Sequence, residues 1–251
     1  MSEVGVAPAA RARDLTKVYG EGDTRVVALD GIDLDVAPGT FTAIMGPSGS
    51  GKSTLMHCLA GLDSATTGEV YIGDVAITGL SDRALTRVRR DSVGFVFQSF
   101  NLVPTLTARE NITLPLDIAG TPVDEAWLAT VIDAVGLGDR LGHRPSELSG
   151  GQQQRVACAR ALASKPSIVF ADEPTGNLDS QSGAEVLALL RRSVDEFGQT
   201  IVMVTHDAAA ASHADRVVFL ADGHVVGSLE RPSAEEILAR IGELATPRGA
   251  H

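Results

Sequence analysis

The sequence predicts an α/β fold built on a parallel sheet. Short apolar runs typical of buried strands alternate with helical segments along the 251 residues, which is the pattern of a parallel sheet covered by helices. Three of these strands end directly at glycine or polar residues, at Gly46, Asp172 and His206. Ligands of open α/β sheets bind beyond the carboxyl ends of the strands, so these positions predict a site at one sheet edge.

The N-terminal part begins with antiparallel strands. Val26 to Val36 alternates apolar and polar side chains and is followed by the turn residues Pro38 and Gly39. The apolar strand Thr40 to Met45 then runs directly into a glycine-rich loop, and Ser53 to Ala60 predicts a helix. A strand, a glycine-rich loop and a helix, in that order, are the context of a phosphate-binding loop.

The middle of the chain predicts a helical insertion. The strand Val93 to Phe97 ends at Gln98, and residues from about 98 to 164 switch to helical periodicity. Interruptions are expected at Pro104, Pro115, Pro122 and Pro145.

The last third returns to alternating strands and helices. The expected elements are the strand Ser167 to Ala171, the helix Ala184 to Phe197, the strand Thr200 to Thr205, a hairpin around Asp222-Gly223, and a final helix opened by a capping box from Ser233 to Glu236. We therefore expect one domain over residues 11–246: a core from 11–97 and 165–230, a helical subdomain over 98–164, and a C-terminal helix over 231–246.

Charge and composition narrow the function. The net charge of −11 argues against a broad nucleic-acid-binding face, so we expect no nucleic-acid partner. Cys58 and Cys158 match no metal-site spacing and are interpreted as small buried hydrophobic residues. No segment approaches the roughly 18 consecutive apolar residues that cross a bilayer, so a membrane role is expected to come through a partner.

The strongest motif is a phosphate-binding loop. It fits the pattern Gly-x-x-x-x-Gly-Lys-Ser/Thr and reads Gly46-Pro47-Ser48-Gly49-Ser50-Gly51-Lys52-Ser53-Thr54. Its backbone N–H groups would point at phosphate oxygens, Lys52 would reach the β- and γ-phosphates, and the Ser53 hydroxyl would bind Mg²⁺. A chance glycine-rich turn is the alternative, and the flanking strand and helix disfavour it.

Two further strand ends carry candidate catalytic groups. Asp172 and Glu173 follow a buried strand, and adjacent strand-end side chains diverge, so Asp172 would hold Mg²⁺ while Glu173 would polarise the attacking water. A solvated acidic turn before Pro174 is the alternative. His206 would bind the γ-phosphate, although a single histidine at a strand end is more often structural.

A second glycine-rich segment opens a helix and reads Leu148-Ser149-Gly150-Gly151-Gln152. Ser149 and Gln152 fit a capping box, but a cap does not explain two consecutive glycines in a first helical turn. Close approach of the backbone to an anion does explain them.

These residues together resemble the ATP-binding-cassette (ABC) ATPase family over nearly the whole chain. Seven elements stand in the family's order: an adenine-stacking aromatic, Walker A, Q-loop, signature, Walker B, D-loop and switch histidine. In this sequence they are Tyr19, 46–54, Gln98, 148–152, Asp172 with Glu173, 177–179 and His206. The resemblance implies a P-loop NTPase with a RecA-like core, an N-terminal antiparallel β subdomain and an inserted α-helical subdomain.

The resemblance also implies a head-to-tail homodimer that encloses two ATP molecules. Its implied catalytic residues are Glu173, His206 and Gln98, and its implied Mg²⁺ residues are Ser53, Gln98 and Asp172. The implied ATP-binding residues are Tyr19, Gly46, Ser48, Gly49, Ser50, Gly51, Lys52, Ser53, Thr54, Ser149, Gly150, Gly151, Gln152 and Asp179.

Six segments are similar to the MacB and LolD group of this family, which also resembles FtsE, namely 18–22, 27–29, 94–104, 110–112, 147–155 and 175–179. That group implies a permease of the MacB/FtsX type and a location at the cytoplasmic face of the cell membrane. Two functions stay open: driving export or extrusion of an antibiotic, peptide or lipoprotein, and FtsE-like control of cell-wall hydrolysis at division. A soluble repair or translation ATPase is disfavoured, because those proteins carry long insertions or two cassettes per chain.

Overall fold

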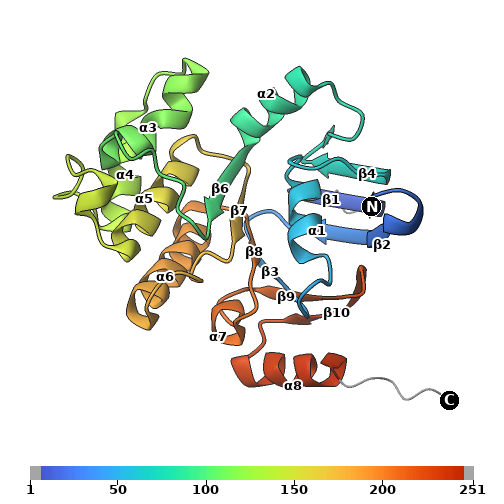
Figure 1. Cartoon of the computed structure of the whole chain (residues 1–251). Coiled ribbons are helices and arrows are strands. Elements are labelled where there is room, and N and C mark those ends of the chain that lie inside the picture. The colour runs from blue at the N-terminus through green and yellow to red at the C-terminus, as the bar shows by residue number, and fades with distance from the viewer. Residues whose placement is uncertain (1–6, 246–251) are drawn as a thin grey trace, which may run out of the picture.

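Two sheets form the framework of the computed structural model, which describes residues 7–245 (Figure 1). A six-stranded sheet has the order β10-β9-β3-β8-β7-β6, and a four-stranded sheet has the order β2-β1-β4-β5. The strands are β1 (Ala10–Tyr19), β2 (Val26–Val36), β3 (Phe41–Met45), β4 (Thr67–Ile72), β5 (Val75–Ala76), β6 (Val93–Phe97), β7 (Ile168–Asp172), β8 (Ile201–Val204), β9 (Arg216–Ala221) and β10 (His224–Glu230). The helices are α1 (Lys52–Leu59), α2 (Asp82–Ser92), α3 (Ala108–Ala119), α4 (Glu125–Val135), α5 (Gly150–Ala163), α6 (Ser180–Phe197), α7 (Ala208–Ala211) and α8 (Ala234–Ala245), with 3₁₀ turns at Gly22–Thr24 and Pro145–Glu147.

The parallel α/β sheet predicted from the sequence is confirmed. Strands β3, β6, β7 and β8 run parallel, β9 is parallel to β3, and β10 returns as an antiparallel hairpin. Successive strand residues face opposite sides of a sheet, so Phe41 and Met45 join one hydrophobic cluster while Ile44 joins the other. Both faces of the sheet are therefore buried, as expected for a parallel sheet.

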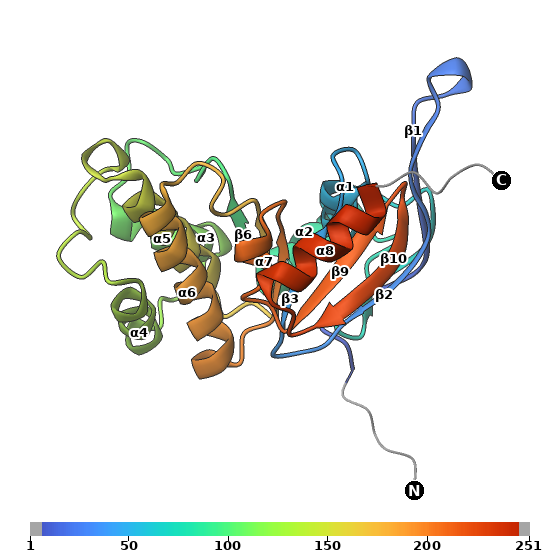
Figure 2. The same cartoon turned by 90° about the horizontal axis from the view of Figure 1, so that it is seen from below.

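The antiparallel part forms the second sheet. The strand predicted over Val26 to Val36 is β2, and it pairs with β1, which also pairs with β4. The sequence pattern does not distinguish β1 and β4 as separate strands. The second sheet lies on the side of α1, while α3, α4, α5 and α6 gather on the other side of the molecule (Figures 1 and 2).

Residues 98–164 contain three helices, α3, α4 and α5. The interruption expected at Pro115 is wrong, because α3 continues through this proline. Proline removes one helical hydrogen bond. The buried side chains Ile112 and Leu116 keep the helix packed on both sides of it.

Several helix boundaries differ from the predicted ones. Helix α6 starts at Ser180 rather than Ala184, because Asp179 caps it. The capping box predicted for the last helix is present, since the Ser233 N–H donates to Glu236 Oε2 over 2.8 Å. Residue 246, the predicted end of that helix, lies outside the described residues.

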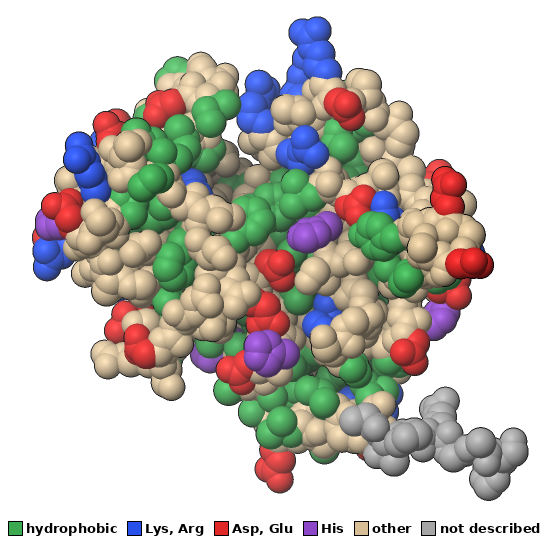
Figure 3. Space-filling model, in the orientation of Figure 1, with side chains coloured by type: hydrophobic (Ala, Val, Ile, Leu, Met, Phe, Trp, Pro, Cys, Tyr) green, Lys and Arg blue, Asp and Glu red, His purple; other side chains and the backbone are tan. Residues whose placement is uncertain are grey.

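The surface is hollowed between the lobe that carries α3 and the lobe that carries α2 (Figure 3).

In the described part of the chain, every helix is too short or too polar to cross a membrane. Both cysteines are buried and free, as predicted, and burial raises the pKa of Cys58 to about 11 and that of Cys158 to about 12.

Candidate active site

Four neighbouring strands end at the predicted site residues. The sheet order β3-β8-β7-β6 places the loop at Gly46, then His206, then Asp172, then Gln98 along one edge. These strands are parallel, so all four residues lie at their carboxyl ends. The structure thus brings together residues that are up to 160 positions apart in sequence, counting from 46 to 206.

The phosphate loop has a conformation that needs glycine. The φ angles are +154° at Gly46 and +99° at Gly51, and a methyl group would overlap the carbonyl oxygen of Leu220 at the first and of Ala28 at the second. Gly51 is also the N-cap of α1, so the positive end of the helix faces the loop. The loop is therefore shaped for an anion.

Lys52 lies folded back over this loop. Its Nζ donates to the carbonyl oxygen of Pro47 over 2.8 Å. Burial lowers the pKa of Lys52, and the neighbouring carboxylates of Glu173 and Asp172 oppose this shift. The ammonium group is therefore held beside the loop and next to the two carboxylates.

The two carboxylates diverge, as predicted. Glu173 Oε1 lies 2.8 Å from His206 Nδ1, while Asp172 Oδ2 lies 4.0 Å from His57 Nε2. Burial raises the pKa of Asp172, as does the charge of Glu173, while His57 and Lys52 lower it. Glu173 has a φ of +45°, a conformation that is uncommon for a residue with a side chain and often found at functional sites.

Gln98 is bound to the loop that follows β7. Its Nε2 donates to Asn177 Oδ1 over 3.1 Å, and Asn177 Nδ2 donates to the Gln98 carbonyl oxygen over 3.0 Å. This reciprocal pair connects the end of β6 to the segment 177–179.

The glycine-rich start of α5 forms the predicted capping box. The Ser149 N–H donates to Gln152 Oε1 over 2.9 Å, and the Gln152 N–H donates to Ser149 Oγ over 3.3 Å. A methyl group on Gly151 would lie 2.7 Å from Ser182 Oγ, so the packing of α5 on α6 already requires this glycine. Anion contact is therefore not needed to explain Gly151, contrary to the sequence argument. Gly150 has no neighbour closer than 3.6 Å to such a methyl group, and internal packing does not explain it.

Asp179 is bound within its own chain. It caps α6, and its carboxylate accepts hydrogen bonds from the backbone of Gln181 and Ser182 at 3.0 Å and from Ser182 Oγ at 2.7 Å. These bonds hold the pKa of Asp179 below its usual range.

Two residues of α5 that the sequence analysis did not single out connect this helix to the sheet edge. Gln154 is fully buried, and its Nε2 donates to the carbonyl oxygens of Pro174 and Phe97 over 2.6 and 3.2 Å. Arg160 donates to the carbonyl oxygens of Phe100 and Asn101 over 2.8 and 2.6 Å. Helix α5 is thus hydrogen-bonded to the segments that follow β6 and β7.

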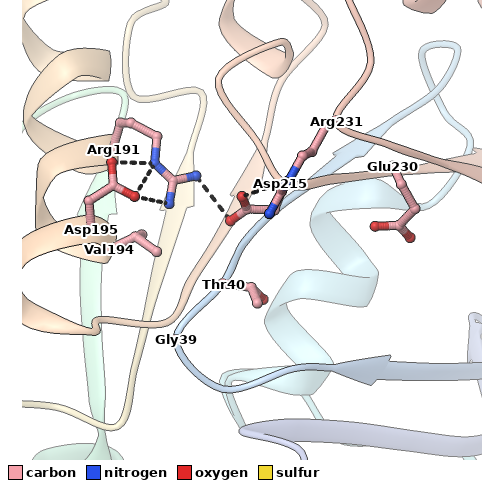
Figure 4. Close-up of a pocket in the computed structure, with 8 residues that line it drawn as sticks. All are labelled: Gly39, Thr40, Arg191, Val194, Asp195, Asp215, Glu230 and Arg231. Carbon is pink, nitrogen blue, oxygen red and sulfur yellow. Dashed lines mark hydrogen bonds and ion pairs between the residues drawn. The ribbon is translucent and has the colours of Figure 1, made fainter.

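A cleft of about 700 Å³ lies at the opposite edge of the sheet, where Gly39 and Thr40 precede β3 (Figure 4). Both of its arginines pair with acidic side chains. Arg191 pairs with Asp195 at 2.7 Å and with Asp215 at 3.0 Å, and Asp215 also accepts the Phe41 N–H at 2.9 Å. This cleft anchors β3, α6 and β9 and does not resemble a phosphate site.

Replacing Asp215 with asparagine is expected to lower the free energy of unfolding at pH 7 by about 1–3 kcal/mol, since charge-assisted hydrogen bonds are lost. Burial alone would raise the pKa of Asp215, but the Phe41 N–H and Arg191 hold it below its usual range. Its stabilisation is therefore present above the unfolded pKa of about 3.9 and is lost as pH falls through the folded value.

Urea titrations of both proteins between pH 7 and 3 would check this, and their difference should shrink below about pH 4. The exposed ion pair of Asp139 with Arg140 supplies the control, because Asp139→Asn should change stability by less than about 0.5 kcal/mol. A pH-independent difference for D215N would contradict the assignment.

Comparison with known proteins agrees with this geometry. A family model described as ABC transporter matches residues 29–176. An uncharacterised ABC transporter ATP-binding protein of Thermotoga maritima is 49% identical over 85% of this chain and 92% of its own length. The macrolide export ATP-binding/permease protein MacB of Brucella melitensis is 49% identical over 88% of this chain. The matched region is only 34% of the length of that relative.

A solved structure of the ATP-binding cassette MJ0796 of Methanocaldococcus jannaschii, a dimer in a post-hydrolysis state bound to ADP and Pi, superimposes with a TM-score of 0.79. It is 43% identical and covers 89% of this chain and 99% of its own. The chain therefore belongs to the ABC transporter family, as one of its ATP-binding ATPase cassettes.

Proposed function

We propose that this chain drives a membrane permease of the MacB/FtsX type by hydrolysing ATP in a head-to-tail homodimer. The observation that carries the proposal is the arrangement of the phosphate loop, Glu173 with His206, and Gln98 at one sheet edge. The phosphates of ATP bind the loop from Gly46 to Thr54 and the N-terminus of α1, as anions do at such helix ends.

A magnesium ion suits the oxygen donors at this edge. The described residues contain no cluster of three or more His, Cys, Asp or Glu side chains that would form an all-protein metal site. Mg²⁺ needs none, because it binds through one or two protein oxygens together with substrate phosphates and water. Ser53, Asp172 and Gln98 Oε1 would hold it, and it would neutralise charge on the β- and γ-phosphates.

Glu173 performs the proton chemistry in this proposal. Its carboxylate orients the attacking water and accepts a proton from it. His206 holds that carboxylate through the 2.8 Å contact and reaches the γ-phosphate with its exposed ring.

The second half of the site comes from another copy of the chain. Helix α5 belongs to the lobe away from α1 (Figure 1), and Ser149 caps its start, so Ser149 and the first N–H groups of α5 would contact the γ-phosphate bound by a partner. Asp179 would lie at the same interface. Each ATP would thus be enclosed by two chains.

Mixing two inactive variants tests this arrangement. Lys52→Ala disables the phosphate loop, and Gly150→Asp places a negative charge at the open start of α5 with little internal overlap. Random mixing should restore about a quarter of the wild-type ATPase rate, because half of the dimers are mixed and each mixed dimer has one intact site. Recovery that stays near zero, with both variants still folded, would contradict the shared site.

A groove between the lobes is suited to the permease. It has a volume of about 300 Å³ and is lined by Phe95, Phe97 and Pro115, with Arg90 and Arg160 beside them. Its lining includes Arg90 of α2 and Pro115 of α3, the two helices on either side of the hollow in Figure 3. Apolar residues beside the exposed Arg90, whose guanidinium also pairs with Asp91 at 2.6 Å, fit a short amphipathic helix that carries acidic side chains. The MacB relatives, which join an ATP-binding part to a permease, support this partner.

The permease proposal places the chain at the cytoplasmic face of the membrane, and purification of the tagged chain from membranes tests it. Mass spectrometry should identify a permease with few membrane helices and a large outer domain. Arg90→Glu should lose this partner, whereas Arg83→Glu, also exposed on α2 but outside the groove, should retain it. A chain recovered without any membrane protein would overturn the transport role. A division phenotype without export would favour control of cell-wall hydrolysis.

A further inference from the structure

Two charged side chains, Lys17 and Asp63, contact the aromatic residue Tyr19. Its hydroxyl donates to Asp63 Oδ2 over 2.6 Å. Lys17 Nζ donates to the other oxygen, Asp63 Oδ1, also over 2.6 Å, and lies 4.8 Å from the centroid of the Tyr19 ring. The three side chains form a closed set in which each touches the other two.

This set is fixed to the helix that follows the phosphate loop. Asp63 lies just beyond α1, and its backbone N–H donates to the carbonyl oxygen of His57 in that helix over 3.2 Å. Lys17 also donates to the Ser64 carbonyl oxygen over 2.8 Å and is only 8% exposed. A buried ammonium group with two short hydrogen bonds has little conformational freedom, so it provides a rigid support.

One face of the Tyr19 ring therefore remains available. Lys17 covers one face, and the whole residue is 42% exposed. The strand register connects Tyr19 to the phosphate loop. Tyr19 pairs with Val26, and Leu29, three residues further along β2, packs against Gly51. Tyr19 also lies beside the end of this loop: burial and the hydrogen bond with Asp63 raise the pKa of Tyr19, and a hydrogen bond with the Thr54 side chain opposes this shift.

We propose that Lys17 and Asp63 are positioning residues that hold the Tyr19 ring as a one-sided platform for the base of ATP, at a fixed distance from the phosphate loop. This inference rests on the proposed function, ATP binding at this site, and on the adenine-stacking role that the family resemblance implies for Tyr19. A ring that is already immobilised loses no side-chain freedom when the base binds, so part of the ATP affinity comes from residues that never touch the nucleotide.

Dissociation constants for ATP and for inorganic triphosphate test the proposal, because triphosphate has no base. Asp63→Ala is expected to weaken ATP binding by about three- to tenfold, the range for one lost hydrogen bond in a binding platform, and Lys17→Met by about threefold. Triphosphate affinity should stay unchanged in both variants. Tyr19→Phe combined with Asp63→Ala should be no weaker than Asp63→Ala alone, because both changes remove the same bond.

Lys165 provides a matched control. Its Nζ binds Asp124 over 2.8 Å and lies 5.4 Å from the Trp127 ring, so it makes the same kind of contacts away from the phosphate loop. Lys165→Met should leave both dissociation constants unchanged. If Asp63→Ala and Lys17→Met weaken the binding of triphosphate as much as the binding of ATP, the two changes act on the phosphate loop, and the positioning role is overturned.

Tyr19→Ala separates this inference from the function on which it rests. If Tyr19→Ala leaves ATP affinity unchanged, the adenine role of Tyr19 fails, and the positioning role fails with it. If Tyr19→Ala weakens ATP but not triphosphate, while Asp63→Ala and Lys17→Met change neither, only the positioning role is overturned.

Discussion

Replacing Glu173 with glutamine is expected to lower kcat for ATP hydrolysis by at least about 100-fold, the lower range for loss of a general base, while ATP still binds. Glutamine keeps the size of the side chain and can still bond to His206, so the strained backbone at position 173 should persist. The amide cannot accept a proton from water, so only the chemical step is lost.

Two measurements check this. Single-turnover assays give the rate of hydrolysis, and size-exclusion chromatography detects the dimer that forms with ATP. Glu173→Gln should accumulate as an ATP-bound dimer, because the step that opens it is blocked. Glu185→Gln is a suitable control, since Glu185 is a half-exposed carboxylate on α6 paired with Arg155 at 3.6 Å, and it should hydrolyse ATP normally. Undiminished hydrolysis by Glu173→Gln would show that Glu173 is not the general base.

The strand-end residues of this site could be predicted because each is local in sequence. Asp172 ends a short apolar strand, and Gly46 and His206 follow two others by one and two residues. The rule that ligands bind at the carboxyl ends of parallel strands brings them to one edge. The strand order could not be predicted, since β3 lies between β8 and β9, whose residues are more than 150 positions away in sequence. Local periodicity contains no information on such pairing.

Contacts between helices explain most of what was missed. The cost of glycine in a helix favours anion contact at Gly151, but the side chain that excludes a methyl group there, Ser182, belongs to α6. Gln154 and Arg160 stand in an ordinary helical run, and only the packing of α5 shows that they bind the segments after β6 and β7. These roles depend on tertiary geometry, which sequence spacing does not define.

The second large effect is expected at Gly51. Gly51→Ala must adopt a φ of +99° and place a methyl group against the carbonyl oxygen of Ala28, so either β2 or the loop has to move. The strained conformation alone costs about 1–3 kcal/mol. A misplacement of about 1 Å can reduce an enzyme's rate about 100-fold, so the ATPase rate should fall by roughly that factor, and ATP affinity should fall as well.

Two other glycines separate strain from overlap. Gly49→Ala meets no atom within 4 Å but has a φ of +78°, so it carries strain without overlap, and Gly138→Ala carries neither. Thermal unfolding and ATP titration of the three variants should therefore show normal behaviour for G138A, a modest loss for G49A and the largest loss for G51A. If G49A and G51A lose the same affinity, backbone strain alone explains the loss and contact with β2 has no part in shaping the loop.

If the ranking holds, strand β2 fixes the position of the phosphate loop. Because β2 also pairs with Tyr19, one strand then connects the binding of the base with the binding of the phosphates.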